Sequence, residues 1–518
     1  MSLVDGWTGR SACALQAALR MSNELFAQRL GIAVRTVASW HQKPSLRPKS
    51  EIQQILDTTL EQASAAVKER FAALTTDSPS GEQPRADERL DIDPNITAAL
   101  DWLDHHADRQ PGASRRDVAS RLAQVDQQDI DERGIRRTHV NQRRVAQALD
   151  EYYRDRDSGH GLYGASYGDG RKVTTSVLTR PDWLDLDCPL IATHDRLVLG
   201  TTTDHATPLD SEAAGHAAQR LAESLACNVR LTDMPLYRLV NIDVSHGRLA
   251  GSVAVTHFVR YALTMDLLEG ELIDALATDV PLSPESLPLR AHYLPDVTSV
   301  VNVSNRLCAG GTLALCAIAR PADPYRGPAD YVLLVQERSG HVVNAARRLA
   351  VIPKGFHQPL TDYRSDAQIG ATLRREMEEE FFGREDIDNT IGDQRRADPM
   401  HPSRLSEPMK WLMGAPERLA MECTGFGLNL VSGNFEFASL IVINDDEFWT
   451  RFGGDIEANW EASTLRQYSS LDSELLSELI EDDAWSNEGL FALLQGLRRL
   501  RQIGGDRVNV PTIEWEMR

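Results

Sequence analysis

Residues 375–380, R-E-M-E-E-E, carry the side chains of this chain that are best suited to metal-assisted chemistry. If they are helical, Glu376, Glu379 and Glu380 share one face, because positions three and four apart are neighbours on a helix. Three clustered carboxylates repel one another unless a cation lies between them. Carboxylate oxygens suit Mg²⁺ or Mn²⁺, and a diphosphate bound beside them would supply further oxygens. The pattern therefore predicts a divalent-cation site.

The elements around this run determine how it would be positioned. Residues 330–338 and 348–356 each have the pattern of a buried strand, and the second ends in Pro353 and Gly355. The order is strand, turn, strand, loop and acidic helix. With the pattern R-E-x-x-E-E, this order resembles the Nudix family. The alternative is an acidic helix whose charged face is simply solvated.

The resemblance assigns roles to individual residues of the motif. It implies that Glu376, Glu379 and Glu380 bind Mg²⁺ (or Mn²⁺) and take part in catalysis. It also implies that Gly355 and Arg375 support the motif structurally. A C-terminal domain built as an α/β/α sandwich is expected from the same resemblance.

The chain departs from the family pattern in the loop before the acidic helix. Where the family has a Gly and a Glu upstream of the Arg, this chain has Thr361 and Ala367, and the nearest substitutes are Gly355 and Asp366. The Gly expected after the paired glutamates is Phe382. The supporting loop is therefore rebuilt. A working hydrolase and a sensor that only binds a nucleotide-like ligand both remain open.

Three further strands are expected in the C-terminal domain. Residues 310–320 should form its first strand, and residues 425–431 and 435–443 a hairpin. Nudix hydrolases often place another acidic residue beyond the motif, as a metal ligand or general base. The resemblance points to Glu436 for this catalytic role, and Glu422 is the competing candidate.

The N-terminal residues carry a second motif. Residues 13–20 and 23–30 have helical spacing, Gly31 ends the second helix, and a third helix is expected from about Ala33. Helix, glycine turn, helix at this spacing is the geometry of a helix-turn-helix. The segments LRMS (19–22), LFAQRLG (25–31) and RTVASW (35–40) resemble the XRE (Cro/phage-repressor-like) family of transcriptional regulators.

The resemblance implies that the third helix enters the major groove of a DNA operator. The candidate DNA-contacting residues are Asn23, Gln28, Val34, Arg35, Thr36, Ser39 and Lys43. Arg35 would read a guanine edge or hold a phosphate, whereas Val37 and Trp40 are expected to pack inward. The alternative is a helix-turn-helix kept for dimerisation or protein contact.

The charge distribution limits where nucleic acid could bind. The net charge of −21 argues against nonspecific binding by the whole molecule. Residues 1–50, however, hold seven Lys and Arg against two Asp and Glu, a balance of 7 − 2 = +5. A phosphate backbone would be tolerated there.

The expected architecture is multidomain α/β. An all-α helix-turn-helix domain (1–74) is followed by a flexible linker (75–93), a helical domain (94–155), an α/β module of unknown role (156–305) and the Nudix-like domain (306–518). Residues 50–74 have helical spacing that suits either a homodimer interface or packing within the chain. Residues 94–155 are locally basic, which fits solvated helix faces or a second DNA-contacting unit.

Composition predicts a cytoplasmic protein with no membrane partner. No apolar run approaches the roughly eighteen residues of a bilayer span, and residues 1–10 lack a signal-peptide pattern. The six cysteines form no C-x-x-C pair, so neither a disulfide framework nor a zinc site is indicated.

Three functions fit these patterns. The first is a DNA-binding regulator whose Nudix-like domain senses a nucleoside-diphosphate-type metabolite with Mg²⁺. The second is an active Nudix hydrolase that cleaves a diphosphate linkage, with the helix-turn-helix serving localisation or autoregulation. The third is a phage-defence or toxin-type effector that represses its own operon. Catalytic turnover of a diphosphate substrate would distinguish the second function from the first.

Overall fold

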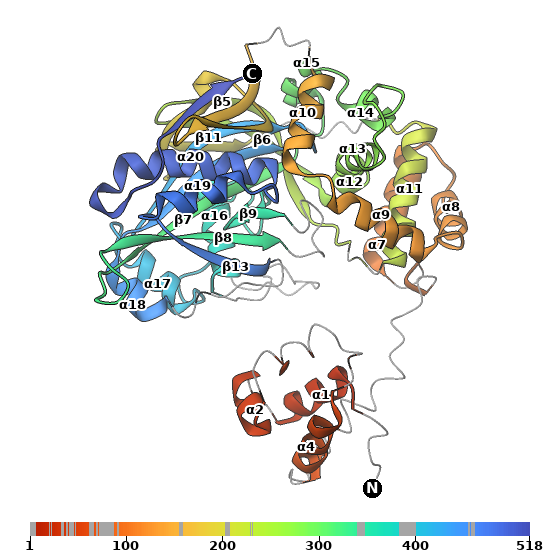
Figure 1. Ribbon diagram of the computed structural model, residues 1–518. Coiled ribbons are helices and arrows are strands. Elements are labelled where there is room, and N and C mark those ends of the chain that lie inside the picture. Colours follow the sequence, from red (N-terminus) through yellow and green to blue (C-terminus); the bar gives the residue numbers. More distant parts are fainter. Residues whose placement is uncertain are drawn as a thin grey trace. The chain divides into compact units, whose positions relative to one another are not determined.

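The computed structural model describes residues 7–19, 21, 23–32, 36–37, 40, 46, 48–61, 67–68, 71, 88–90, 93–154, 159–201, 208–227, 229, 231–338, 348–382, 400–453, 456 and 462–518. The chain forms two compact units, Met1–Arg85 and Ala86–Arg518 (Figure 1). It is a multidomain α/β protein with helices and mixed β-sheets, as expected.

The first unit consists of helices packed around aromatic side chains. Trp7, Phe26 and Trp40 are each at most 1% exposed, and the rings of Phe26 and Trp40 meet edge to face with centroids 6.5 Å apart. Gly31 follows the second helix with φ of +65°, the left-handed conformation that glycine adopts at a helix C-terminus. The helices with defined bounds are α1 (Gly9–Leu19), α2 (Asn23–Leu30) and α4 (Ser50–Glu61).

The second unit is organised around one large mixed sheet. Its strands run in the order β13-β8-β7-β12-β11-β2-β1-β14, with β3, β9 and β10 paired at its sides, and a smaller sheet has the order β4-β6-β5. Their bounds are β1 (Gly161–Tyr167), β2 (Arg171–Thr179), β3 (Leu184–Pro189), β4 (Asp195–Leu199), β5 (Pro235–Ser245), β6 (Arg248–His257), β7 (Gly310–Arg320), β8 (Asp330–Arg338), β9 (Leu349–Val351), β10 (Lys354–Phe356), β11 (Leu419–Asn429), β12 (Phe435–Ile443), β13 (Ala462–Ser469) and β14 (Ile513–Met517).

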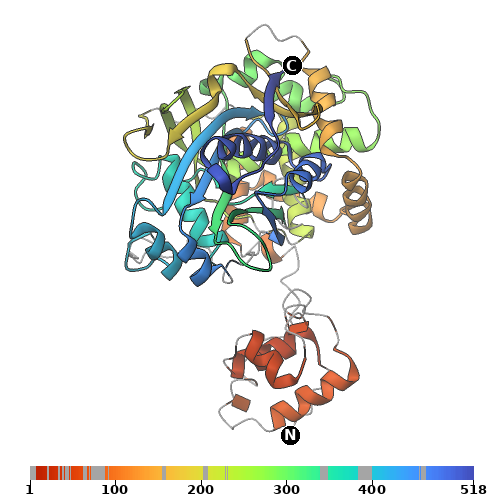
Figure 2. The same ribbon diagram turned by 60° about the vertical axis from the view of Figure 1, so that its left-hand side comes forward.

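Helices cover both faces of the large sheet. Successive side chains of a strand point to opposite faces. Leu313 and Leu315 of β7 therefore pack into one core cluster with Phe491 of α20 (Asn487–Ile503), whereas Ala314 packs into another with Leu373 of α16 (Ile369–Glu380). Both views show α20, in dark blue, lying across the strands (Figures 1 and 2). The helix α16 thus lies on the face opposite α20.

The helices of the second unit precede these strands or lie between groups of them in the sequence. Their bounds are α7 (Pro94–His106), α8 (Ala113–Leu122), α9 (Gln127–Thr138), α10 (Gln142–Tyr152), α11 (Ser211–Ala226), α12 (Phe258–Ala262), α13 (Leu267–Ala277), α14 (Pro288–Tyr293), α15 (Val297–Val301), α16 (Ile369–Glu380), α17 (Glu407–Met413), α18 (Asp446–Phe452), α19 (Ser473–Glu481) and α20 (Asn487–Ile503). Short 3₁₀ turns lie at Pro181–Trp183, Val303–Asn305 and Gly505–Arg507.

Part of the middle segment, β1 to β3, joins the C-terminal sheet, whereas β4, β5 and β6 form the separate smaller sheet. β2 pairs with β11, and β1 pairs with the C-terminal β14, so the sheet extends across the expected boundary at residue 305. The turn between β11 and β12 is also buried against the middle segment. There Arg290, fully buried, donates a 2.6 Å hydrogen bond to the backbone oxygen of Val431.

Two local expectations are wrong. The glycine-rich residues 159–172, whose composition favours an ordered loop, instead form most of the β1–β2 hairpin. The single strand expected over 348–356 is divided in two: β9 pairs with β8, and β10 pairs with β7. Pro353 lies at the division, and it has no backbone N–H to donate to a strand ladder.

Candidate functional site

The acidic helix α16 packs against β10 at a point where only a glycine fits. A Cβ placed on Gly355 would lie 2.1 Å from Cδ of Glu376 and 2.2 Å from its Oε1. These separations are far below contact distance, so the carboxylate of Glu376 occupies the space that any other side chain at 355 would need. Gly355 thus leaves the space on β10 that the Glu376 carboxylate occupies.

Arg375 ties α16 to the end of β10 and to the residues that follow it. Its Nη1 donates to the backbone oxygen of Gln358 at 3.1 Å, and its Nη2 donates to the backbone oxygen of Phe356 at 3.2 Å. The same Nη2 lies 2.8 Å from Oε1 of Glu376. The side chain of Arg375 is only 3% exposed, so these charge-assisted bonds are shielded from water.

The three glutamates of the motif have different partners. Glu376 contacts Arg375, and Oε1 of Glu379 lies 3.9 Å from Nε of the same guanidinium. Glu380 turns to the sheet instead: its Oε2 accepts a 2.8 Å hydrogen bond from the backbone N–H of Lys354, and its Oε1 faces Nε2 of Gln336 at 3.5 Å. Arg375 and the Lys354 N–H therefore supply the positive charge and donors that these carboxylates need.

This arrangement does not bring together the three-carboxylate metal site that the resemblance implies. Among the described residues, no group of three or more His, Cys, Asp and Glu is placed to hold one ion. Glu380 is engaged by the backbone, whereas Glu376 and Glu379, with side chains 10% and 15% exposed, share Arg375. Two carboxylates are the number that Mg²⁺ often takes from a protein when phosphate oxygens and water complete its shell.

The rebuilt loop before α16 is organised by Asp366. Its Oδ2 accepts hydrogen bonds from the backbone N–H groups of Leu360, Thr361 and Asp362, at 2.8, 3.1 and 3.1 Å. Ala367, where the family has a glutamate, is fully buried. Asp366 thus folds the loop on itself, and Ala367 packs in the core.

His357 is a buried titratable side chain beside this loop. Its ring is fully buried and packs on Tyr237, with ring centroids 4.5 Å apart. Burial lowers its pKa to about 3, and the nearby charge of Arg375 acts in the same direction. His357 is therefore neutral near pH 7 and serves as packing at the base of the loop.

The structure separates Glu436 from the acidic helix. Its neighbours Phe435 and Phe437 pack in the core cluster on the α16 side, so Glu436 points to the opposite face, where α20 lies. Burial raises its pKa to about 8, and the charge of Glu488 adds to the rise, while Lys354 opposes it. A carboxyl that is mostly protonated and across the sheet from Glu376 is not placed to act as its general base.

A buried ion pair lies beside Glu436. Nζ of Lys354 is 2.6 Å from Oε1 of Glu488, and Nδ2 of Asn429 donates to the other oxygen of Glu488 at 3.2 Å. Although burial acts to raise it, the Lys354 ammonium holds the pKa of Glu488 below its ordinary value. Sequence patterns did not single out Lys354, although a lysine between Pro353 and Gly355 in an apolar strand was a usable signal.

The competing candidate Glu422 forms an ion pair with a residue of α20. Its Oε2 accepts a 2.6 Å hydrogen bond from Nε of Arg499 on α20, and Arg499 also contacts Asp187 at 2.9 Å. Glu422 therefore joins an ion-pair network that fastens α20 to β3 and β11.

The N-terminal candidates are described in part. Val34, Arg35, Ser39 and Lys43 lie outside the described residues. Asn23 and Gln28 belong to α2, of which the backbone is described at these positions, and Thr36 is half-buried. The expectation that Val37 and Trp40 pack inward is confirmed, because their side chains are 0% and 1% exposed.

The basic helices of residues 94–155 have their own acidic partners. Arg137 makes a two-pronged contact with Asp274, with its Nη2 2.6 Å from Oδ2, and Arg133 lies 2.6 Å from Glu223. Further ion pairs join Arg121 to Asp117, Arg143 to Asp483 and Arg144 to Asp279. These contacts favour solvated, internally paired helix faces over a second DNA-contacting unit.

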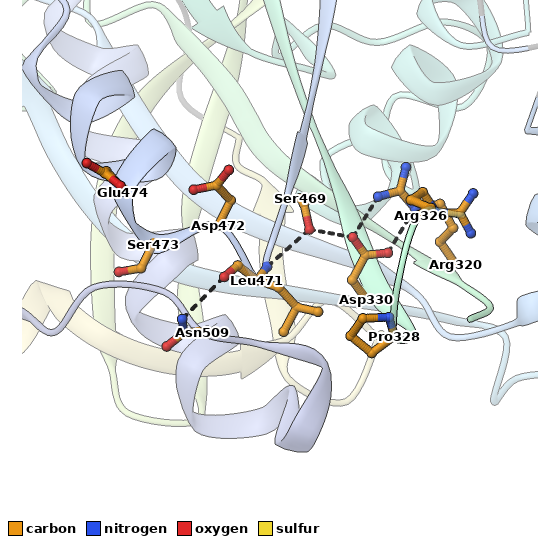
Figure 3. A pocket seen from close by; sticks show the side chains of 10 residues that line it. All are labelled: Arg320, Arg326, Pro328, Asp330, Ser469, Leu471, Asp472, Ser473, Glu474 and Asn509. Carbon is orange, nitrogen blue, oxygen red and sulfur yellow. Dashed lines mark hydrogen bonds and ion pairs between the residues drawn. The ribbon is translucent and has the colours of Figure 1, made fainter. Parts of the chain in front are cut away.

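A surface cleft of about 590 Å³ lies far from the acidic helix (Figure 3). Two of its charged groups bond to each other, because Arg320 holds Asp330 with two contacts of 2.8 and 2.6 Å. Gly355 pairs with Thr312 of β7, whereas the cleft lies at Arg320, eight residues further along the strand. At about 3.3 Å per residue this separation is roughly 26 Å, so the cleft is not part of the α16 site.

Comparisons with known proteins identify no relative. A scan against protein-family models found no match, and a search of curated proteins found none either. Within the described residues, every helix is too short or too polar to cross a lipid bilayer.

Proposed function

We propose that this chain is a DNA-binding transcriptional regulator whose C-terminal domain is a Nudix-like sensor of a nucleoside-diphosphate-type metabolite. The N-terminal unit would bind an operator, and the α16 site would bind the metabolite with Mg²⁺ or Mn²⁺. Binding of the metabolite can change DNA affinity only if it favours one arrangement of the protein over another.

The observation that carries the DNA-binding part is the core of the first unit. Trp40 packs against Phe26 of α2, and Gly31 turns the chain between them in a left-handed conformation. This is the packing that a helix-turn-helix requires, because the second helix of the motif must cross the first while its other side stays available to DNA. The balance of +5 in residues 1–50 supports contact with phosphates.

The partners of the motif glutamates favour a sensor over an enzyme. Glu380 binds the backbone of Lys354, and Glu376 and Glu379 share Arg375. Glu376 and Glu379 are the residues that would hold a cation together with a diphosphate. A general base is also needed for hydrolysis, and Glu436 lies on the other face of the sheet.

The test is a ligand panel run with the purified full-length protein and Mg²⁺ or Mn²⁺. The panel contains ADP-ribose, dinucleotides, nucleotide sugars and nucleoside triphosphates, and both thermal shift and product formation are measured. We expect a metal-dependent thermal shift with one compound and no product. The shift should disappear in the double variant Glu376→Gln/Glu379→Gln.

The matched control is Glu407→Gln, which removes the same charge from a glutamate whose side chain is 77% exposed on α17. It should leave the thermal shift unchanged. Product formation that the double variant abolishes would instead make this chain a Mg²⁺-dependent Nudix pyrophosphohydrolase. A panel with neither shift nor product would overturn the assignment of the α16 site.

A further inference from the structure

The start of the acidic helix is held by a carboxylate from another part of the chain. The first N–H groups of a helix have no partner within the helix, and here the residue at the N-cap position, Gln368, makes no side-chain capping bond. Oδ2 of Asp195, the first residue of β4, accepts the N–H of Gly370 at 2.9 Å. Asp195 is 1% exposed, so water does not compete for this bond.

The contact between α16 and this segment is tight. A Cβ on Gly370 would lie 2.7 Å from the backbone oxygen of Leu190, so the first turn of α16 is pressed against the turn that leads into β4. Arg375 and Glu376 follow one and a half turns later on the same helix. The position of their side chains therefore depends on where this first turn is held.

Asp195 is surrounded by few compensating charges. Arg374 of α16 faces it, and the other titratable neighbours are the buried thiols of Cys188 on β3 and Cys423 on β11. Burial raises the pKa of Asp195 to about 6, although the N–H groups of Gly370 and Leu197 act to lower it. An ionised carboxylate at this position thus costs stability near neutral pH, and a neutral side chain would not.

We propose that Asp195 is a positioning residue for the acidic helix, through which the middle segment sets the geometry of the α16 site. The proposal deepens the proposed function, because it gives the strand β4 a role in the metabolite site. The charge of Asp195 costs stability, yet its carboxylate holds the start of the helix that bears the site. This combination is expected where a charged residue is kept for function and not for folding.

The test is amide hydrogen exchange measured by mass spectrometry on the full-length protein, wild type and Asp195→Asn. At pH 7.5 we expect the amides of 369–371 to exchange about tenfold faster in Asp195→Asn, as for the loss of a charge-assisted hydrogen bond. The melting temperature should stay equal or rise, because the costly charge is gone. If Asp195 served folding alone, faster exchange at 369–371 would come with a lower melting temperature.

A pH profile gives a second readout. After correction for the intrinsic exchange rate, the protection of 369–371 in the wild type should fall as the pH is lowered from 7.5 to 5, because Asp195 becomes protonated. The variant Asp195→Asn should show no such change, and the two proteins should agree at pH 5.

The matched control is Asp104→Asn. Asp104 also caps a helix from outside, accepting the N–H groups of Gly112 and Ser114 of α8 at 2.6 and 2.7 Å. Although burial acts to raise it, the hydrogen bonds from Ser114 and Gly112 hold the pKa of Asp104 below its ordinary value. This variant should speed exchange at 112–114 and leave 369–371 unchanged.

Two results would overturn the proposal. One is unchanged exchange at 369–371 in Asp195→Asn. The other is a general loss of protection across 86–518 together with a lower melting temperature, which would make Asp195 a folding residue. Because exchange needs no ligand, a ligand panel without hits would leave this result intact.

Discussion

At the scale of single residues, the α16 site requires a glycine at position 355, because no other residue leaves room for the Glu376 carboxylate. The carboxylate of Glu376 lies where a Cβ of residue 355 would be, and Arg375 holds that carboxylate from the other side. The glutamate can therefore keep its place only while residue 355 is glycine. This relation explains why P-x-G precedes the loop and the acidic helix in this chain.

Gly355→Ala should destabilise the protein and displace Glu376. We expect a loss of about 1–3 kcal/mol in the free energy of unfolding, because the new methyl group pushes the Glu376 carboxylate away from its buried contact with Arg375. Urea denaturation of the full-length protein measures it. The control is Gly134→Ala on α9, where a Cβ would meet nothing within 4 Å. That change should stabilise the protein by up to about 1 kcal/mol. Equal effects of the two substitutions would contradict the account.

Glu436→Gln should stabilise the protein more as the pH rises. The folded-state pKa of about 8 lies above the ordinary value of 4.5, so the native protein retains a proton that the unfolded chain loses. Wild-type stability from this group is greatest at low pH and decreases as the pH rises through 8. The advantage of Gln over Glu should grow by about 3 kcal/mol between pH 6 and pH 9. If the unfolding free energies of the wild type and of Glu436→Gln change in parallel with pH, Glu436 is not buried as described.

Residue types and spacing predicted part of the site. Glycine at 355 and arginine at 375 stood out because they flank a loop and open the acidic run, and both contact Glu376. The pattern could not show that Glu380 would bind the backbone of Lys354, or that Glu436 would face away, because strand pairing decides on which face each side chain lies. Asp195 carries no local signal at all, since its partner Gly370 is 175 residues away.

At the scale of elements, β10 connects helices on the two faces of the sheet. The backbone N–H of Lys354 binds Glu380 of α16, and its ammonium binds Glu488 in the first turn of α20. One residue thus fixes the position of a strand between two helices. Displacing its side chain should therefore disturb α16 as well as α20.

A double-mutant cycle at Lys354 and Glu488 tests this connection. Lys354→Met alone should cost about 3–5 kcal/mol, because it leaves the Glu488 carboxylate buried without its cation. Adding Glu488→Leu should recover a large part of that loss, which urea denaturation will show as a strong coupling energy. Glu447→Gln, which breaks the exposed pair with Arg451 on α18, should cost less than about 1 kcal/mol. Additive effects at Lys354 and Glu488 would refute the buried pair.

Strands with continuous apolar runs were the best predicted elements. The expected bounds of 310–320 and 330–338 agree with β7 and β8, and the hairpin of β11 and β12 turns where Gly433 was expected to turn it. Both faces of these strands are covered, so the central residues of each strand form a continuous apolar run. The β1–β2 hairpin was missed because its glycines and hydroxyl residues give no such run.

At the scale of the whole molecule, the chain has two units with opposite charge. Residues 1–85 hold ten Lys and Arg against eight Asp and Glu, a balance of 10 − 8 = +2, so residues 86–518 carry −21 − 2 = −23. The large sheet contains strands from 161 to 517, which makes Ala86–Arg518 one unit. A local pattern could not reveal this, because β1 and β14 meet across more than 300 residues of sequence.

The two units should unfold independently. A protein that starts at Ala86 should keep the melting temperature of the main transition of the full-length chain within about 2 °C, since it retains the whole large sheet. Differential scanning calorimetry of the two proteins measures this. A large fall in the main transition after removal of residues 1–85 would mean that the units stabilise each other.

The most direct test of the account is selection of duplexes from a randomised DNA library by the full-length protein. We predict enrichment of a defined sequence that binds more weakly as salt is raised, because the basic unit releases counterions from phosphates. Its affinity should fall at least tenfold in Arg35→Ala and remain unchanged in Gly134→Ala. No enriched sequence, or equal binding by the protein that starts at Ala86, would contradict a DNA-binding regulator.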